Sequence, residues 1–245
     1  MEASLSFIVP LRKSLSTNHL NYMRCLISLV EQRTDFPTDI IFVVDGVAEE
    51  EKPTIEKELG LGLEEAQRIV DAVVPESMKG QCCHRCGLLT IKEWKGSGGS
   101  RNAGIKDSDS EWIWCIDADD WITDPYAAMT LVHAAEEHPE LHALQCDSYQ
   151  GLVPNKQAPM MPWLRIVKRE TYLAAPFPEK TLSNEDTAQF VALRDILTNT
   201  DHGLHVIQHQ APYFYNVMAP SSATAHHGGL FETKVEPEYS DGPQW

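Results

Sequence analysis

Short apolar runs and amphipathic segments alternate along the first 150 residues of the chain. Residues 5–10 and 39–44 are apolar runs with the length of buried parallel strands. Between them, apolar side chains recur at helical spacing from residue 20 to residue 30, behind a capping Thr17 or Asn18. This order predicts a β-α-β unit, and therefore a parallel sheet with its connecting helix packed on one face.

The same patterns predict the remaining elements. We expect helices over residues 49–68, 100–106, 125–137 and 184–197, and strands over residues 69–74, 88–94, 111–116, 142–149 and 163–167. From residue 228 onward glycine, proline and acidic residues dominate. The pattern therefore predicts one α/β domain over residues 1–227, with a mixed, mostly parallel, Rossmann-like sheet flanked by helices. A flexible acidic tail is expected over residues 228–245.

Charge narrows the classes of partner. The chain has 20 Lys and Arg against 36 Asp and Glu, a formal net charge of −16. This balance disfavours nucleic acid and anionic membrane surfaces, which are bound by neutralising many phosphates. The apolar stretches fall far short of the ~20 residues that a membrane helix needs, and the first residues contain no secretory leader. We expect a cytoplasmic protein with no membrane span and with reduced cysteines.

Three aspartates follow the strand predicted over residues 111–116. Asp117, Asp119 and Asp120 lie at its carboxyl end, where open α/β sheets bind their ligands. In extended backbone Asp117 and Asp119 would point to the same side, and a cation between them would relieve their repulsion. Carboxylate oxygens suit Mg²⁺ or Mn²⁺, which commonly bridge protein carboxylates to phosphates of a substrate. The alternative is a surface acidic turn that caps the helix at Pro125.

A second cluster is rich in cysteine. Cys82, Cys83, His84 and Cys86 lie within five residues, and two of these cysteines have the spacing of half a zinc site. The other half is missing from the local sequence, although Cys115, Cys146 or a distant histidine could complete it. Buried or inert thiols are the alternative.

Five features, in order, resemble family 2 glycosyltransferases of the GT-A fold. They are the first strand with Pro10, the strand end at residues 43–46, the Gly-Gly-Ser-Arg-Asn-Ala-Gly-Ile segment at 98–105, the aspartates with Trp121, and Asn-Glu-Asp at 184–186. Each feature alone is weak, but the order and spacing match over residues 5–190. One feature departs from the family pattern, because Val44 stands where the family usually has the first of two aspartates.

The resemblance implies a role for each matching residue. Asp45 would hydrogen-bond the nucleotide base, for which a carboxylate suits the imide N–H of uracil. The nucleotide-sugar site would also include Pro10, Arg101, Asn102, Asp117, Asp119 and Trp163. Metal ligands would be Asp119, Asp120 and, near the C-terminus, His226. Asp186 would be the general base for the acceptor hydroxyl.

Most of these residues also have a purely structural interpretation. Asp45 could belong to an Asp-Gly turn, and Arg101 with Asn102 to a helix-capping turn. Asp186 could be an acidic residue in the first turn of a helix. A surface position is the alternative for His226, and a core position is the alternative for Trp163.

The predicted function is a metal-dependent, inverting glycosyltransferase with Mn²⁺ or Mg²⁺. It would move a sugar from a nucleotide sugar, with UDP as the expected nucleotide, to an acceptor hydroxyl; a nucleic-acid acceptor is disfavoured by the charge. Residues 1–120 would bind the donor and residues 121–227 the acceptor. Two alternatives remain: a nucleotidyltransferase-like enzyme, against which the lack of glycine at residues 10–16 counts, and a non-catalytic nucleotide-sugar-binding protein.

Overall fold

The computed structural model describes residues 4–11, 19–73, 84–146, 148–150, 153–155, 162–180, 185–199, 204–206 and 213–215. Within them the elements are β1 (Leu5–Leu11), α1 (His19–Val30), β2 (Thr38–Asp45), α2 (Lys52–Val73), β3 (His84–Ile91), α3 (Gly96–Asp107), β4 (Trp112–Cys115), β5 (Trp121–Ile122), α4 (Ala127–Glu136), β6 (Ala143–Gln145), β7 (Ser148–Gln150), β8 (Val153–Asn155), the 3₁₀ helix η3 (Pro162–Leu164), β9 (Arg165–Lys168), α5 (Arg169–Ala174), α6 (Glu185–Asn199), β10 (Leu204–Val206) and β11 (Tyr213–Tyr215). The expected tail at 228–245 and His226 lie outside the described residues.

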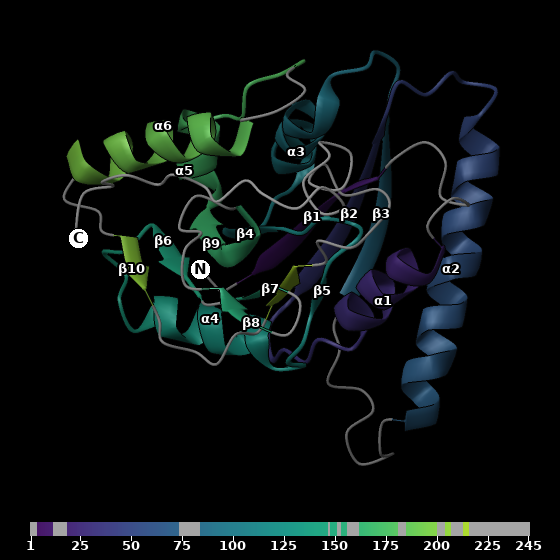
Figure 1. The fold of residues 1–245 in the computed structure, drawn as a ribbon, viewed down its shortest axis with the longest axis horizontal. Coiled ribbons are helices and arrows are strands. Elements are labelled where there is room, and N and C mark those ends of the chain that lie inside the picture. Colours follow the sequence, from purple (N-terminus) through teal and green to yellow (C-terminus); the bar gives the residue numbers. More distant parts are fainter. Residues whose placement is uncertain are drawn as a thin grey trace, which may run out of the picture.

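A mixed, mostly parallel sheet of seven strands forms the centre of the molecule, in the order β10-β6-β9-β4-β1-β2-β3 (Figure 1). β9 runs antiparallel to both of its neighbours, and the other described pairs in this sheet are parallel. β5, β11, β7 and β8 form a second, smaller sheet. The predicted fold class is therefore confirmed.

Helices cover both faces of the large sheet. Alternate residues of β1 point to opposite faces, so that Phe7 and Val9 join a core with α1, α2 and α4, while Ile8 joins a core with α3, α5 and α6. Figure 1 shows α5 and α6 on one side of the sheet and α4 on the other. Burial on both faces explains why the parallel strands are almost continuously apolar.

The strand expected over residues 69–74 is wrong, because residues up to Val73 belong to α2. The buried side chains of this helix, Ile55, Leu59, Ala66 and Val70, recur every four or seven residues on one face. Spacing of this kind is helical, and the run after residue 68 continues it. The next strand of the sheet is β3, which starts and ends before the expected 88–94 segment does.

Other boundaries also differ from the expected ones. Residues 142–149 divide into β6 and β7, which belong to different sheets, and residues 163–167 divide into the end of η3 and β9. α4 begins at Ala127 because Pro125 lies in the turn before it. In the described part of the chain, no helix has both the length and the apolar character needed to cross a membrane.

Residues 96–99 form the first turn of α3, so this helix begins four residues before the expected residue 100. Two glycines let this helix lie close to its surroundings. A Cβ on Gly98 would lie 2.3 Å from the carbonyl oxygen of Pro178, and one on Gly104 would lie 2.6 Å from Cγ2 of Ile8 in β1. The absence of these side chains therefore positions α3 against the sheet and against the segment that follows α5.

Candidate active site

The carboxyl ends of parallel strands meet at one edge of the large sheet. Asp45 ends β2, and Asp117 lies two residues beyond the end of β4. α3 begins at the same edge, since Gly96 follows β3 closely and the end of β3 pairs with the end of β2. Such an edge is the usual ligand-binding position in open α/β sheets.

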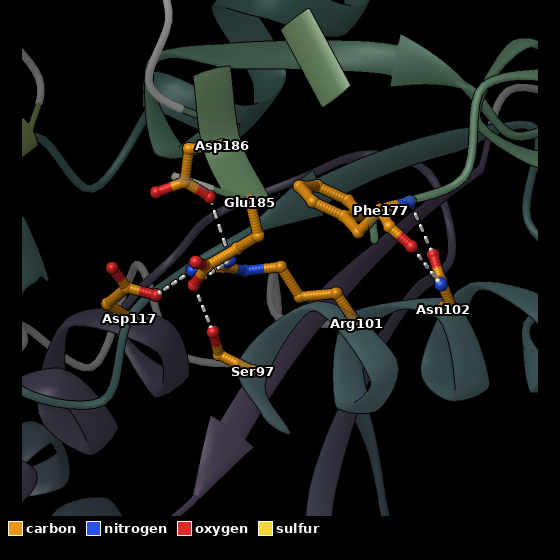
Figure 2. A network of polar contacts seen from close by, with 7 residues as sticks. All are labelled: Ser97, Arg101, Asn102, Asp117, Phe177, Glu185 and Asp186. Atoms are coloured by element: carbon orange, nitrogen blue, oxygen red, sulfur yellow. Dashed lines mark hydrogen bonds and ion pairs between the residues drawn. The ribbon is translucent and has the colours of Figure 1, made fainter. Parts of the chain in front are cut away.

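Arg101 lies at the centre of a group of three carboxylates (Figure 2). Its Nη2 donates to Oδ1 of Asp117 over 2.6 Å, and its Nη1 donates to Oδ1 of Asp186 over 2.9 Å. Oε1 of Glu185 lies 3.9 Å from the same Nη1. Only 2% of Arg101 is exposed. The guanidinium therefore joins α3, the loop after β4 and the first turn of α6.

Two further residues hold this group in place. The hydroxyl of Ser97 donates a short hydrogen bond to the carboxylate of Glu185. The ring centroid of Phe177 lies 5.3 Å from Cζ of Arg101, within cation–π range. Sequence patterns did not identify the roles of Ser97, Phe177 and Glu185, although Glu185 stands next to Asp186 in a recognisable motif.

Burial raises the pKa of Asp186 to about 6. The nearby Arg101 opposes this effect, while Asp117 and Glu185 add to it. Burial by itself would lower the pKa of Arg101, but the carboxylates of Asp117 and Asp186 outweigh it, so that the pKa is raised and the guanidinium stays charged. Asp186 is 22% exposed at its side chain. It can therefore accept a proton from a bound hydroxyl near neutral pH.

Both polar atoms of the Asn102 side chain contact the backbone of Phe177. Its Nδ2 donates to the carbonyl oxygen of Phe177 over 2.8 Å, and its Oδ1 accepts from the Phe177 N–H over 2.9 Å. α3 begins at Gly96, so Arg101 and Asn102 lie inside the helix, and the expectation that they stand at a helix start is wrong.

The carboxylate of Asp45, the last residue of β2, lies at the N-terminus of α3. Its Oδ2 accepts from the backbone N–H groups of Lys95 and Gly96 over 2.8 and 2.7 Å. The anion at this helix start is therefore a side chain of the protein itself. Gly46 has a φ of +67°, which confirms the Asp-Gly turn. Trp94, which is 50% exposed, packs beside Gly46.

The aspartate loop is a turn and not an extended segment. The N–H of Asp120 donates to the carbonyl oxygen of Asp117 over 3.1 Å, so the expectation that alternation directs Asp117 and Asp119 to one side is wrong. Asp117 points to Arg101 (Figure 2), Asp120 is 1% exposed, and Asp119 is partly exposed. The thiol of Cys25 donates to the carbonyl oxygen of Asp117. Burial is the main cause of its raised pKa, and the negative charges of the three aspartates add to this effect.

The donor chemistry of this loop fits a divalent cation. Among the described residues no group of three or more His, Cys, Asp or Glu side chains could hold a metal ion. Mg²⁺ sites, however, often use only one or two carboxylates together with substrate phosphates and water. Asp119 and Asp120 carry two such hard oxygen donors in this loop, and Asp117 is paired with Arg101. The metal site remains a prediction for these two residues.

Pro10 lies in β1 in register with Val43 of β2, close to the carboxyl end of the strand. Trp163 lies in η3, and its side chain is outside the described part of the chain.

The structure excludes one of the residues proposed to complete a zinc site, Cys115. Cys82, Cys83 and the side chain of His84 lie outside the described residues, while Cys86 is an exposed free thiol on β3. Cys115 is on β4, and β1 and β2 lie between these two strands. Three strand spacings amount to roughly 14 Å. Cys115 therefore cannot share a zinc ion with Cys86.

Solved structures with the same architecture are glycosyltransferases of GT-A type. S. aureus TarS superposes with a TM-score of 0.61 at 19% identity over 87% of this chain and 37% of that one. Its 1–349 fragment in complex with UDP-GlcNAc gives 0.61 at 18% identity over 87% and 58%. The mannosyltransferase PcManGT from Pyrobaculum calidifontis, in complex with GDP-Man and Mn²⁺, gives 0.53 at 15% identity over 90% and 59%. The chain thus spans less than two thirds of these proteins.

The fold defined by the sheet and its flanking helices is therefore the GT-A fold. Residues 78–198 match the model of glycosyl transferase family 2, which confirms the resemblance predicted from the sequence motifs. No curated protein matches the sequence. The structural likeness, at under 25% identity, supports the fold, while the family match includes α3, the aspartate loop and the start of α6.

Proposed function

We propose that this protein is a metal-dependent, inverting glycosyltransferase that moves a sugar from a UDP-sugar to an acceptor hydroxyl. The observation that carries the proposal is the carboxylate of Asp186, partly exposed, with a pKa of about 6, and linked through Arg101 to the aspartate loop. A general base and an acidic donor-side loop are thereby brought to one edge of the sheet. The family match agrees with this chemistry.

Asp186 is the proposed base. It accepts the proton of the acceptor hydroxyl while that oxygen forms a bond to the anomeric carbon of the donor sugar. The bond from the anomeric carbon to the diphosphate oxygen breaks, and its electron pair leaves with the nucleoside diphosphate. Attack opposite the leaving group inverts the anomeric configuration. Mn²⁺ or Mg²⁺, held by Asp119 and Asp120 with His226 as a further ligand, would neutralise the charge on that leaving group.

The donor is proposed to bind over the ends of β1, β2 and β4. Oδ2 of Asp45 is engaged at the N-terminus of α3, whereas Oδ1 has no hydrogen-bond partner among the described residues and can accept the imide N–H of uracil. The exposed indole of Trp94, beside Gly46, offers a surface on which a base can stack.

The remaining donor contacts fall to Pro10, Asp117, Asp119 and Trp163. In this proposal residues 1–120 supply most of the donor site and residues 121–227 the acceptor site. Two neighbours support the donor class, since one TarS structure contains UDP-GlcNAc and the PcManGT structure contains GDP-Man and Mn²⁺.

Nucleoside diphosphate release tests the proposal. The protein is incubated with Mn²⁺ and a panel of UDP- and GDP-sugars, with acceptor candidates, and compared with Asp186→Asn, Asp120→Ala and the control Asp195→Asn. Asp195 lies on the same helix as Asp186 but is exposed and distant from Arg101. We expect UDP release that chelation abolishes, a loss of at least ~100-fold in Asp186→Asn, and full activity in Asp195→Asn.

Three results would contradict the proposal in different ways. If no nucleotide sugar is consumed and no nucleotide binds, the transferase function is wrong. If Asp186→Asn retains full transfer activity, the fold assignment stands and Asp186 is not the base. Binding of UDP without turnover over a broad acceptor panel would instead favour a nucleotide-sugar-binding protein.

A further inference from the structure

We propose that Arg101 is a positioning residue that holds Asp186 at a fixed place relative to the donor-side loop without itself touching either substrate. The inference rests on the proposed function, because it concerns the base of that reaction. It differs from the role implied by the family resemblance, in which Arg101 lies against the nucleotide.

Burial separates Arg101 from any ligand. The residue is 2% exposed, and both of its terminal nitrogens already donate to carboxylates of the protein. A donor phosphate would have to displace Asp117 or Asp186 to reach the guanidinium. Each displacement would leave a partly buried carboxylate, and the fully buried guanidinium, without a partner, which is costly.

Geometry assigns a different task to this side chain. Nη2 holds Asp117, from the loop after β4, and Nη1 holds Asp186, from the first turn of α6, so one planar group sets two carboxylates at a fixed angle (Figure 2). The two carboxylates are 69 positions apart in the sequence. A lysine ammonium could supply the charge but not this planar, forked geometry.

Phe177 and Asn102 hold the guanidinium of Arg101 in position. Phe177 lies against one of its faces, and the two hydrogen bonds from Asn102 fix Phe177 to α3, the helix that also carries Arg101. Figure 2 shows Phe177 beside the Arg101 side chain, with its two hydrogen bonds to Asn102 on the same helix. Asn102 thus supports the same arrangement from one position further along the chain.

Four charged groups act on Asp186 from the surrounding elements. Arg101 on α3 and Arg165 on β9 favour its ionised form, while Asp117 after β4 and Glu185 on α6 disfavour it. Of the two cations, Arg101 has the larger effect and is the one in contact. Without Arg101, the carboxylates of Asp117, Glu185 and Asp186 would repel one another. Asp186 would then move from its position, and its pKa would rise.

The test compares Arg101→Gln and Arg101→Lys with the wild type and with Arg33→Gln as control. Arg33 is also a buried arginine, but it donates to the hydroxyl of Tyr126, away from the carboxylate group. The pKa of Asp186 is measured by ¹³C-carboxyl NMR titration without substrate, with the signal assigned through Asp186→Asn. UDP affinity and the pH dependence of kcat and KM are measured in parallel.

We expect Arg101→Gln to raise the pKa of Asp186 by about 1 unit or more and to lower kcat at least ~10-fold, with UDP affinity within ~3-fold of the wild type. Arg101→Lys should keep the pKa close to the wild-type value and still lower kcat, because charge is retained and geometry is lost. Arg33→Gln should leave the pKa unchanged.

An unchanged pKa of Asp186 in folded Arg101→Gln would overturn the inference, as would a UDP affinity lowered more than ~10-fold with an unchanged pKa. If Arg101→Gln does not fold, Arg101→Lys decides, since full kcat in that variant contradicts the need for a forked cation. The NMR measurement needs no turnover. A wild type that transfers no sugar would therefore refute the proposed function while the link between Arg101 and Asp186 is still measured.

Discussion

The side chain of Asn102 and the backbone of Phe177 exchange two hydrogen bonds, of 2.8 and 2.9 Å, in a setting that water does not reach. One joins the amide N–H₂ to a carbonyl oxygen and the other joins the backbone N–H to the amide oxygen. The segment after α5 is thereby fixed to α3 next to Arg101. This contact uses both polar ends of a residue that the family resemblance assigned to the nucleotide.

Asn102→Ala should therefore act first on stability. It leaves the N–H and the carbonyl group of Phe177 buried without a partner, at a cost on the order of 2 kcal/mol in the free energy of unfolding. Urea unfolding measures the loss, and Gln67→Ala, which removes an exposed amide contact on α2, should change little. A large loss of UDP affinity with unchanged stability would favour the nucleotide role.

Gly98→Ala tests the close approach of α3 to the same segment. The new Cβ would lie 2.3 Å from the carbonyl oxygen of Pro178, a backbone atom that cannot move without the chain. We expect a loss of about 1–3 kcal/mol in the free energy of unfolding and lower activity, because the displaced segment supports Arg101.

Gly60→Ala is the matched control, since it lies inside α2 with open space around its Cβ. Alanine in a helix interior is better than glycine by roughly 0.5–1 kcal/mol, so this variant should be slightly more stable. Thermal unfolding of both variants gives the comparison. Equal effects of the two substitutions would show that α3 does not need its glycine for packing.

Asp45→Asn separates the two tasks of that residue. The amide oxygen can still accept from Lys95 and Gly96 at the start of α3, but the free carboxylate oxygen becomes an N–H₂ donor. This N–H₂ group cannot accept a hydrogen bond from the imide N–H of uracil, but it can donate one to N3 of cytosine. We expect UDP affinity to fall at least ~10-fold with stability near that of the wild type, and the preference for UDP over CDP to narrow. An unchanged UDP affinity, measured by titration calorimetry, would mean that Asp45 only caps the helix.

Elements whose local pattern is decided by burial could be predicted from the sequence. β1 and β2 are buried on both faces and so appear as apolar runs, and α1 keeps its apolar residues at helical spacing. The segment at 69–74 misled the prediction because Ile69 and Val70 are neighbouring β-branched residues. Only their relation to Ala66, one turn earlier, shows that they end a long helix.

The sequence predicted some of the residues of the candidate site but not the contacts between them. The order of motifs predicted that Asp45, Asp117 and Asp186 lie in one site. The structure places Asp117 and Asp186 around Arg101 and the carboxylate of Asp45 at the start of α3. The sequence does not show which cation stands between which carboxylates. That pairing depends on α6 reaching α3, which connects Arg101 with a residue 85 positions later, and on a phenylalanine that no motif contains.

The raised pKa of Asp186 makes a prediction for stability as a function of pH. Its folded-state value of about 6 is above the ordinary 3.8, so the native state binds this proton more strongly than the unfolded chain does. The resulting stabilisation is complete below pH 3.8 and is lost as the pH rises through 6. Between pH 5 and pH 8 the free energy of unfolding falls by about 1.4 kcal/mol. This is the value of about one pH unit for one proton, because pH 5 lies about one unit below the folded-state pKa of Asp186.

Asp186→Asn, which resembles the neutral form at every pH, should not show this loss. In protein without added metal or nucleotide, its melting temperature relative to the wild type should therefore increase by about 3–6 °C between pH 5 and pH 8. Asp195→Asn, on the exposed face of the same helix, should show no such trend. A difference between wild type and Asp186→Asn that stays constant, or that moves in the opposite direction, would show that Arg101 stabilises the ionised carboxylate at least as strongly as burial opposes it.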